Sequence, residues 1–346
     1  MPSQPPLPPL LAPYLSTQPE SSLTLVSSIL GATSNWLILR FLHAALSNSS
    51  NNAFIGLEDS PDSKKKKVVL VSFLRGWEFW KAEAKRLGLD LTRLAGKQQF
   101  AYVDGLSELF TTPKPAGNTL PTLSAGSPAP ARTTLPLRYQ PGTLPGRSPA
   151  QANNPIGQGN ASGPINSEPG VAKKLNFAGQ GLTALDALER DISTVIAKLK
   201  TAEDDEVLLI IDQPDFLLAS TGPSYAIGAT EMMDWATGLQ QAAHATVLTL
   251  AADSPLLHNA PVASNQMSTP VESEHAVFAI GLAHRAQSVM QLRTLETGAA
   301  RDVSGVLRIS RGGGWSTGAE ENLEEKELLF YIQRDGGVRV FGRGES

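Results

Sequence analysis

The sequence predicts an α/β fold with three layers, a mostly parallel sheet and antiparallel hairpins toward the C-terminus. Two observations lead to this prediction. Short apolar runs typical of buried strands alternate with amphipathic helical segments, which is the pattern of parallel βα units. The last strands are instead separated by glycine-rich segments, Gly312–Gly314 and Asp335–Gly337, which are typical of hairpins.

Composition limits the possible classes of function. The chain has 346 residues, of which 41% are apolar and 18% charged, so it can bury a substantial core. Its net charge is −4, so any contact with nucleic acid depends on a local basic patch. The absence of cysteine excludes disulfides, thiolate metal sites and cysteine nucleophiles. The proline-rich start does not resemble a signal peptide, and no apolar run approaches the ~20 residues of a membrane helix, so no membrane partner is expected.

The first part of the chain supplies three predicted strands and two helices. The strands are expected over 22–27, 68–73 and 100–104, and the first helix over 36–46 with Ser34 or Asn35 as N-cap. In the second helix Trp77, Trp80, Ala84 and Leu87 share one face, and Gly88 is a natural stop. The two tryptophans are either core residues or a platform on which bases stack.

The second part continues the alternation. Helices are expected over 182–200, 230–243 and 272–282, and strands over 207–212, 245–250, 288–295, 305–310, 328–333 and 338–341. The segment Val207–Asp212 is continuously apolar up to its last residue, which suits a strand buried on both faces of a parallel sheet.

Two segments are expected to stay outside the core. Residues 1–20 are interpreted as a disordered tail, and residues 111–178 as a disordered low-complexity insertion rich in Pro, Gly, Ser, Thr and Asn. As a flexible coil the insertion would span roughly 45 Å on average, so a compact fold can close across it. Residues 21–110 and 179–346 are therefore predicted to form a single domain.

The loop between the first strand and the first helix lies where P-loop proteins hold phosphate with the pattern Gly-x4-Gly-Lys-Ser/Thr. Here residues 27–35 retain one glycine, Gly31, and no lysine. Thr33 and Ser34 still offer hydroxyls and N–H groups at a helix N-terminus. The loop is therefore either an ordinary βα connection or a degenerate P-loop, and ATP hydrolysis is not expected from it.

Three residues are candidates for a nucleotide interface. Asp212 ends a hydrophobic strand, as does the aspartate that orients magnesium in a Walker B strand, although an aspartate there also turns the chain. Arg308 and Arg311 lie in and just after a predicted edge strand, and are either surface charges or groups that face a partner subunit.

The basic run Lys64, Lys65, Lys66 and Lys67 is either a solvated loop or a set of contacts to RNA phosphates, which would give affinity without reading sequence. The five histidines lack metal-ligand spacing, and no Ser–His–Asp arrangement is evident. We therefore expect no catalytic residue, no metal site and no cofactor.

Several segments together resemble the RecA-like sixth subunit of Elongator, the complex that modifies tRNA. They are Leu23–Val26 with the loop to Trp36, Phe73–Trp80 with Leu87–Asp90, Tyr102–Leu106 with Leu109 and Phe110, Leu208–Asp215, and Asp302–Gly312. The long low-complexity insertion is similar to that of fungal members.

The resemblance implies a RecA-like domain in a heterohexameric ring with two related RecA-like subunits. Such a ring binds tRNA and associates with the catalytic Elongator subcomplex, which modifies wobble uridines (U34). It also implies a cytoplasmic location, with the nucleus as a second. Because the phosphate loop departs from the ATPase pattern, the chain is expected to be a non-enzymatic subunit. The alternatives are an active RecA-like ATPase, such as a recombinase paralogue, and a self-assembling regulator of the circadian-clock or archaeal RecA-like type.

Overall fold

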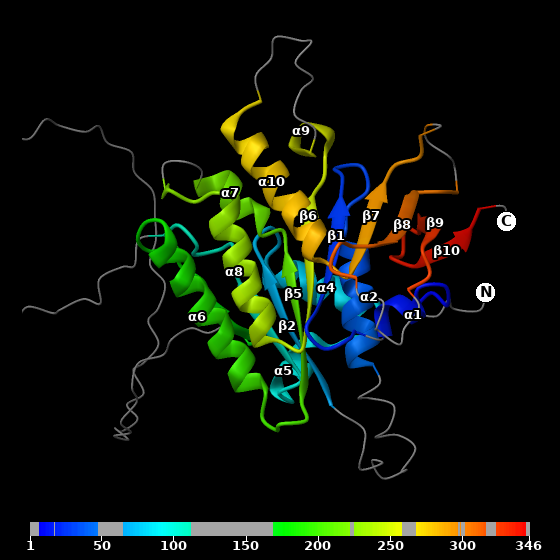
Figure 1. The fold of residues 1–346 in the computed structure, drawn as a ribbon. Coiled ribbons are helices and arrows are strands. Elements are labelled where there is room, and N and C mark those ends of the chain that lie inside the picture. The colour runs from blue at the N-terminus through cyan, green and yellow to red at the C-terminus, as the bar shows by residue number, and fades with distance from the viewer. Residues whose placement is uncertain are drawn as a thin grey trace, which may run out of the picture. The chain divides into compact units, whose positions relative to one another are not determined.

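Ten strands form one sheet within the part of the chain that the computed structural model describes (Figure 1). Described are residues 7–16, 18–47, 65–111, 169–221, 225–257, 268–296, 298, 302–315 and 323–343. The strands, in their order across the sheet, are β10 (Val338–Gly342), β9 (Lys326–Ile332), β8 (Gly305–Arg311), β7 (Ser288–Arg293), β1 (Ser22–Ser28), β6 (Ala245–Ala251), β5 (Glu206–Asp212), β2 (Lys66–Ser72), β3 (Phe100–Asp104) and β4 (Val171–Lys174). The strands from β4 to β7 in this order pair in parallel, and β7, β8, β9 and β10 pair antiparallel. The fold class predicted from the sequence is confirmed.

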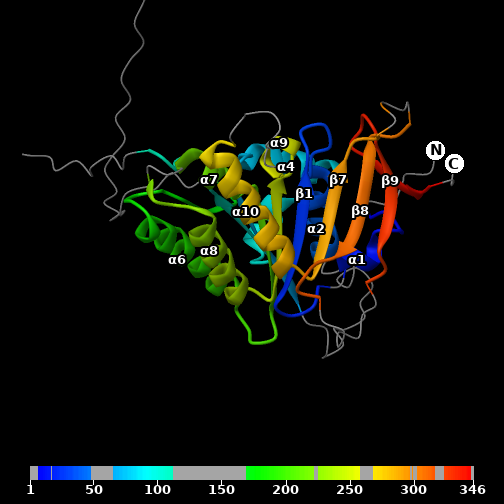
Figure 2. The same ribbon diagram turned by 45° about the horizontal axis from the view of Figure 1, so that its top comes forward.

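Helices cover both faces of the parallel part (Figure 2). One face packs against α6 (Leu182–Leu199), α7 (Asp215–Thr221), α8 (Ala229–Ala242) and α10 (Pro270–Arg285), with the short α9 (Ser254–Leu257) against α10. The other packs against α1 (Ala12–Ser16), α2 (Asn35–Leu46), α4 (Trp77–Arg86) and α5 (Leu91–Gly96). The result is the three-layer arrangement that the alternating pattern predicts.

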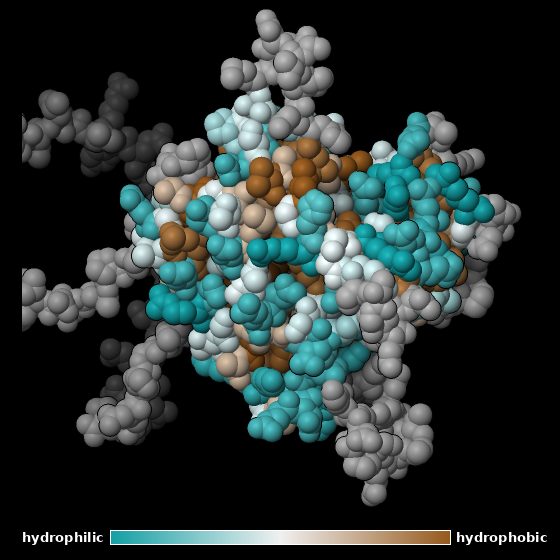
Figure 3. All heavy atoms as spheres, in the orientation of Figure 1, coloured by the Kyte–Doolittle hydropathy of each residue, from teal (hydrophilic) through white to brown (hydrophobic). Residues whose placement is uncertain are grey.

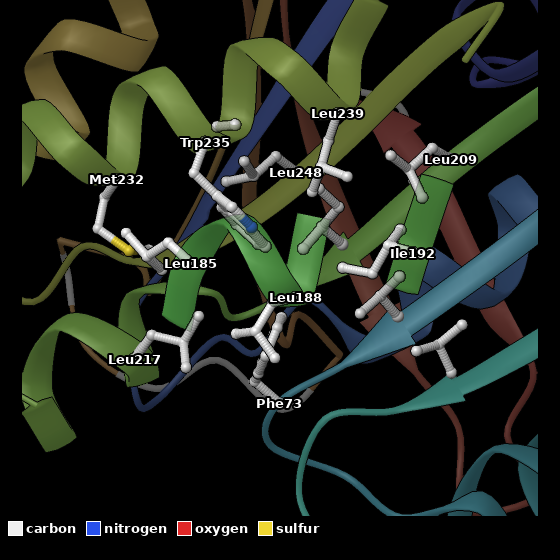
Figure 4. Packing of buried hydrophobic residues seen from close by; sticks show 14 of the residues in the cluster. Phe73, Leu185, Leu188, Ile192, Leu209, Leu217, Met232, Trp235, Leu239 and Leu248 are labelled. Atoms are coloured by element: carbon white, nitrogen blue, oxygen red, sulfur yellow. The ribbon is translucent and has the colours of Figure 1, made fainter. Parts of the chain in front are cut away.

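The apolar stripe of α6 shows why this helix lies on the sheet. Leu185, Leu188 and Ile192 recur at helical spacing, and all three are buried. They meet side chains of α8 and of the strands, including Trp235 and Leu248 (Figure 4). Burial of each such side chain is worth about 1.5–3 kcal/mol, so this stripe fixes α6 more strongly than helix propensity does.

The tryptophans of α4 belong to the core. Trp77 and Trp80 are 4% and 0% exposed, and the Trp77 ring lies 5.3 Å from the Tyr102 ring between centroids. Their interpretation as core residues is confirmed, and the stacking platform is excluded for these two. Gly88 has a φ of 79°, in the left-handed region that favours glycine, and ends the helical segment as predicted.

Only one of the two glycine segments is a tight hairpin turn. Asp335–Gly337 joins β9 to β10, and Gly336 has a φ of 86°. Gly312–Gly314 instead begin the longer connection between β8 and β9, which pair antiparallel as predicted, and they lie against the end of α10. Their N–H groups donate to the carbonyl oxygens of Gln287 (3.0 Å), Ala283 (3.0 Å) and Ala286 (2.9 Å) respectively. A Cβ on Gly312 would lie 2.1 Å from the Ala286 oxygen, so these three residues cap the last turn of α10 at a distance that only glycine permits.

Parts of the two segments that were expected to stay outside the core form regular structure. Within residues 1–20, α1 packs against α2, and Leu15 of this helix and the preceding Leu11 are buried. Within residues 111–178, β4 extends the sheet beside β3, and Leu175 and Phe177 are buried. Both elements are too short for a periodic pattern and depend on tertiary contacts instead. The described elements belong to the compact unit 1–112 and 167–346, and the second unit, 113–166, lies outside the described residues.

Candidate functional site

The candidate site lies at the carboxyl ends of β1, β2, β5 and β6. In open parallel α/β sheets, ligands bind at this edge, in the loops that follow the strands. The loop after β1 takes the place of the phosphate loop, and Asp212 ends β5 between Ser72 of β2 and Thr249 of β6. The sequence-predicted positions of the loop and of Asp212 therefore meet at one edge of the sheet.

The loop after β1 is a tight turn, not an open cradle. Ile29 and Ala32 form an isolated antiparallel bridge, and the Ala32 N–H donates to the Ile29 oxygen at 2.9 Å. The side chain between them, Leu30, is 86% exposed, and its N–H donates to Asp253 at 3.1 Å. A Cβ on Gly31 would lie 2.9 Å from the Thr294 side chain, so the turn also packs closely against this residue. With no lysine and with the N–H groups of Leu30 and Ala32 already bonded, the loop lacks the parts that hold β- and γ-phosphates.

Thr33 and Ser34 follow the turn, where the sequence analysis expected their hydroxyls at the N-terminus of the first helix. Thr33 donates to the Asn35 side chain at 2.6 Å. Ser34 precedes α2, but its side chain makes no capping hydrogen bond, and its buried hydroxyl has no partner among the described residues. Ser34, one of the two residues predicted as N-cap, is thus the N-cap of α2, but it caps the helix without a side-chain hydrogen bond.

Asp212 is completely buried, and its carboxylate is saturated with donors. Ser72 donates to it at 2.8 Å and Thr249 at 3.2 Å. A single nitrogen of Arg75, Nη1, reaches both carboxylate oxygens, at 3.0 and 3.1 Å. Burial raises the pKa of Asp212, while the positive charge of Arg75 and the hydrogen bonds from Ser72, Arg75 and Thr249 act in the opposite direction.

The Arg75 guanidinium takes the position where a cation would meet this carboxylate. A magnesium ion would have to displace it, together with part of the hydroxyl contacts. Among the described residues, no group of three or more His, Asp or Glu side chains is placed to hold a metal. Arg75 lies 137 positions from Asp212 in the chain, and no feature of the sequence pairs them.

A second buried pair lies beside the first and was missed in the sequence. Asp215, at the start of α7, accepts from the Ala251 N–H at 3.1 Å and meets Nε2 of His275 at 3.2 Å. The other ring nitrogen of His275 lies 3.2 Å from the Leu256 oxygen. These two contacts of the His275 ring connect α10 to Asp215 of α7 and to Leu256 of α9. The pair thus braces the helices that cover this edge.

Arg308 and Arg311 are not brought to Asp212. Both are exposed on β8, which is four strands away from β5, or roughly 19 Å at the usual strand spacing. The Arg311 guanidinium lies over the Trp315 ring, 5.1 Å from its centroid. Within one chain the three nucleotide-interface candidates therefore do not form one site.

The lysine run divides into residues with different roles. Lys64 lies outside the described residues, and Lys65 is exposed. Lys66 begins β2 and donates to the Ser16 oxygen at 2.6 Å. Lys67 is 6% exposed and contacts Asp205 at 2.8 Å. An RNA phosphate contact by Lys67 does not fit this arrangement, because Lys67 lies within β2, which begins earlier than predicted, and its ammonium is buried against Asp205.

No helix in the described part of the chain combines the length and the apolar character needed to cross a membrane.

Comparison with known proteins supports the fold. No protein-family model matches the chain, and no curated protein matches its sequence. Among solved structures, it is similar to the crystal structure of a KaiC-like protein from the hyperthermophilic archaeon Pyrococcus horikoshii, with a TM-score of 0.51 and 13% sequence identity. The match covers 98% of this chain and 97% of the other. At this identity the likeness shows the fold alone, and together with the sheet order it identifies the fold as RecA-like.

Proposed function

We propose that the chain is a non-catalytic RecA-like subunit of the Elongator ring, where it supports tRNA binding and modification of the wobble uridine. The observation that carries the proposal is the state of the site at the carboxyl edge of the sheet. The loop after β1 is a closed turn without lysine, and Asp212 is neutralised by Arg75 of the same chain. Both parts of a nucleotide site are thus replaced within an otherwise well-formed RecA-like sheet.

Two of the segments that resemble the Elongator subunit build this altered site. Phe73–Trp80 contains Arg75 and begins α4, while Leu208–Asp215 contains Asp212 and begins α7. The segments that resemble the Elongator subunit therefore include the residues at which a non-catalytic subunit would differ from an active ATPase. An active RecA-like ATPase is disfavoured for the same reason.

An apolar surface beside the site supports assembly with another subunit. Val277 and Ile280 lie on one face of α10 and are 54% and 50% exposed. Figure 3 shows hydrophobic side chains gathered over this helix. Leu30 is held to Asp253, which directly precedes α9, and α9 packs on α10. Contiguous exposed apolar side chains mark interaction surfaces, and head-to-tail contacts between like folds close a ring.

Introducing charge on this surface should prevent assembly. The double variant Val277→Asp/Ile280→Asp is expected to reduce co-purification of the two related subunits at least tenfold, because two carboxylates would be desolvated in the interface. Its melting temperature should stay close to that of the wild type, since both side chains face solvent in the isolated chain. Leu182→Asp, at a residue 57% exposed on α6, is the matched control. Wild-type assembly by the double variant would contradict this use of α10.

The purified chain should not hydrolyse ATP above background, because its closed loop supplies no lysine for the phosphates. The measurement is steady-state phosphate release with magnesium present, with Asp212→Asn as the comparison. Turnover that the wild type shows and Asp212→Asn lacks would favour the active ATPase instead.

Affinity purification of the tagged chain, followed by mass spectrometry, tests membership of the ring. We expect two different RecA-like proteins in equal amounts with the chain, together with the catalytic Elongator subunits and tRNA. Recovery of the chain bound only to copies of itself would reject the proposal and favour a self-assembling regulator.

A further inference from the structure

A small cavity lies between α2, α4 and the turn that joins β9 to β10, with a volume of about 60 Å³. Since one water molecule needs roughly 10–15 Å³ of such space, the cavity can hold a group of a few heavy atoms. Its lining shares no residue with the site around Asp212. The cavity is therefore a separate feature of the molecule.

Arg40 of α2 is a buried cation that lines this cavity, and it is 2% exposed. Its Nη2 donates to the Gly336 oxygen at 3.2 Å, and Gly336 lines the cavity as well. The guanidinium end of the side chain therefore lies beside the cavity. The Nε atom is buried and has no hydrogen-bond partner in the described part of the chain. A guanidinium carries five N–H donors, so the contact with Gly336 satisfies only part of its capacity.

The charge of Arg40 has no carboxylate partner among the described residues. Glu83 is the acidic residue that lines the cavity, but it pairs with Arg86 at 2.8 Å. Burial lowers the pKa of Arg40 to about 10, and no acid acts against this. With Arg40 and Arg86 set against Glu83, the lining carries one uncompensated positive charge. A buried charge without a partner is costly, and an anion in the cavity would remove this cost.

The rest of the lining is mostly apolar and comes from Trp36, Leu39, Leu87 and Ile332. Ile332 is 37% exposed, whereas Trp36 and Leu39 are buried. A guanidinium binds a carboxylate through parallel N–H···O bonds, and apolar side chains beside it favour a hydrocarbon stem on that carboxylate. A phosphate fits less well, because its further oxygens would lose water against these side chains without gaining donors.

We propose that this cavity binds one carboxylate group on a short apolar stem, with Arg40 as its counter-ion. The carboxylate belongs either to a free short-chain acid or to an aspartate or glutamate side chain of another protein, since both present the same group. All lining residues come from one chain, so the proposal is independent of membership in a ring.

Saturation-transfer difference NMR on the purified full chain tests the proposal at neutral pH. The probes are propionate, its uncharged amide propionamide, inorganic phosphate as a competitor, and glutamate blocked at both backbone ends. We expect propionate to bind, and propionamide and phosphate to bind about tenfold more weakly or less, because they lack the charge or the apolar stem. Equal or tighter binding of the blocked glutamate identifies a protein side chain as the source, and weaker binding identifies a free acid. Absence of binding by both carboxylates would overturn the proposal, as would phosphate binding more tightly than propionate.

Replacing Arg40 by methionine should abolish propionate binding. The melting temperature should stay close to that of the wild type, because methionine keeps an apolar stem and removes a buried charge that has no partner. Leu87→Glu places a carboxylate at the cavity within the chain itself and should also abolish binding, whereas Leu87→Gln has the same size without the charge and should retain it. This pair decides the question even if Arg40→Met fails to fold. Propionate binding by Leu87→Glu at wild-type affinity would refute the role of Arg40.

Glu83 is the internal alternative to an external carboxylate. It lines the cavity, and a rotation of its side chain away from Arg86 would bring it toward Arg40. We expect Glu83→Gln to bind propionate as well as the wild type does, because Glu83 is engaged by Arg86. Binding that appears only in Glu83→Gln would overturn the proposal and make Glu83 the partner of Arg40.

Discussion

Replacing Arg75 by alanine is expected to lower the free energy of unfolding by about 3–5 kcal/mol, because it leaves the Asp212 carboxylate buried without its positive partner. Asp212 is fully buried, and the Arg75 side chain is 16% exposed, so water cannot take over the role of the guanidinium. The measurement is urea unfolding of both proteins at neutral pH. Arg86→Ala is the control. Arg86 pairs with Glu83 on the surface of α4, so this replacement should lower the free energy of unfolding by less than about 1 kcal/mol.

The loss of stability in Arg75→Ala should also depend on pH, in a direction that follows from the pKa of Asp212. Burial already raises the pKa of Asp212, and loss of Arg75 should raise it further. A carboxyl group whose pKa is higher in the folded state contributes stability below its unfolded pKa and loses it as the pH rises through the folded pKa. The deficit of Arg75→Ala should therefore shrink as the pH falls from neutral toward the pKa that Asp212 has in the unfolded chain. Adding Asp212→Asn should restore part of the lost stability at neutral pH. A deficit that grows on acidification would contradict this account.

Replacing Lys67 by methionine should cost about 2–4 kcal/mol, although Lys67 lies in a run that looks like a solvated surface. The Lys67 ammonium donates to the Leu199 oxygen at 2.8 Å, to the Thr201 hydroxyl at 2.7 Å and to Asp205 at 2.8 Å. Methionine keeps the apolar stem but removes all three contacts. Lys65→Met is the matched control, since Lys65 is exposed and only two positions away. Equal unfolding free energies of the two variants would contradict the inward role of Lys67.

Acid titration provides a second measurement at this site. Burial acts to raise the pKa of Asp205, but the hydrogen bonds from Lys67 and from residues 201 and 202 outweigh it and lower the pKa to about 2. A depressed carboxyl pKa contributes stability above the unfolded value, and this is lost as the pH falls through the folded value. The wild type should lose about 1–2 kcal/mol from this group between about pH 4 and about pH 2, and Lys67→Met should lose less.

The sequence predicts well what depends on local periodicity. The helix over 182–200 and the strand over 207–212 agree with α6 and β5 within one residue at each end, because their apolar patterns are strong and uninterrupted. Edge elements such as β4 are not predictable in this way. Val171 is the only apolar residue in β4 that contributes substantially to packing, so pairing with β3 decides that it forms.

The candidate site shows a different limit. That Asp212 ends a buried strand follows from its own neighbours in sequence, but its partner Arg75 is brought to it only by the pairing of β2 with β5. The lysine run illustrates the same point. Lys67 is distinguished by its contacts with Leu199, Thr201 and Asp205, which only the packing of β2 beside the end of α6 brings to it. Composition alone cannot distinguish Lys65 from Lys67.

The three glycines that cap α10 make this short segment unusually sensitive to inherited change. Any missense mutation of a glycine codon adds at least one side-chain atom, and a Cβ on Gly312, Gly313 or Gly314 would meet backbone oxygens at 2.1, 2.6 and 2.3 Å respectively. Backbone atoms at the end of a packed helix cannot retreat as a flexible side chain would. We therefore expect glycine to be kept at these three positions even where other segments between strands vary, because no larger residue fits there.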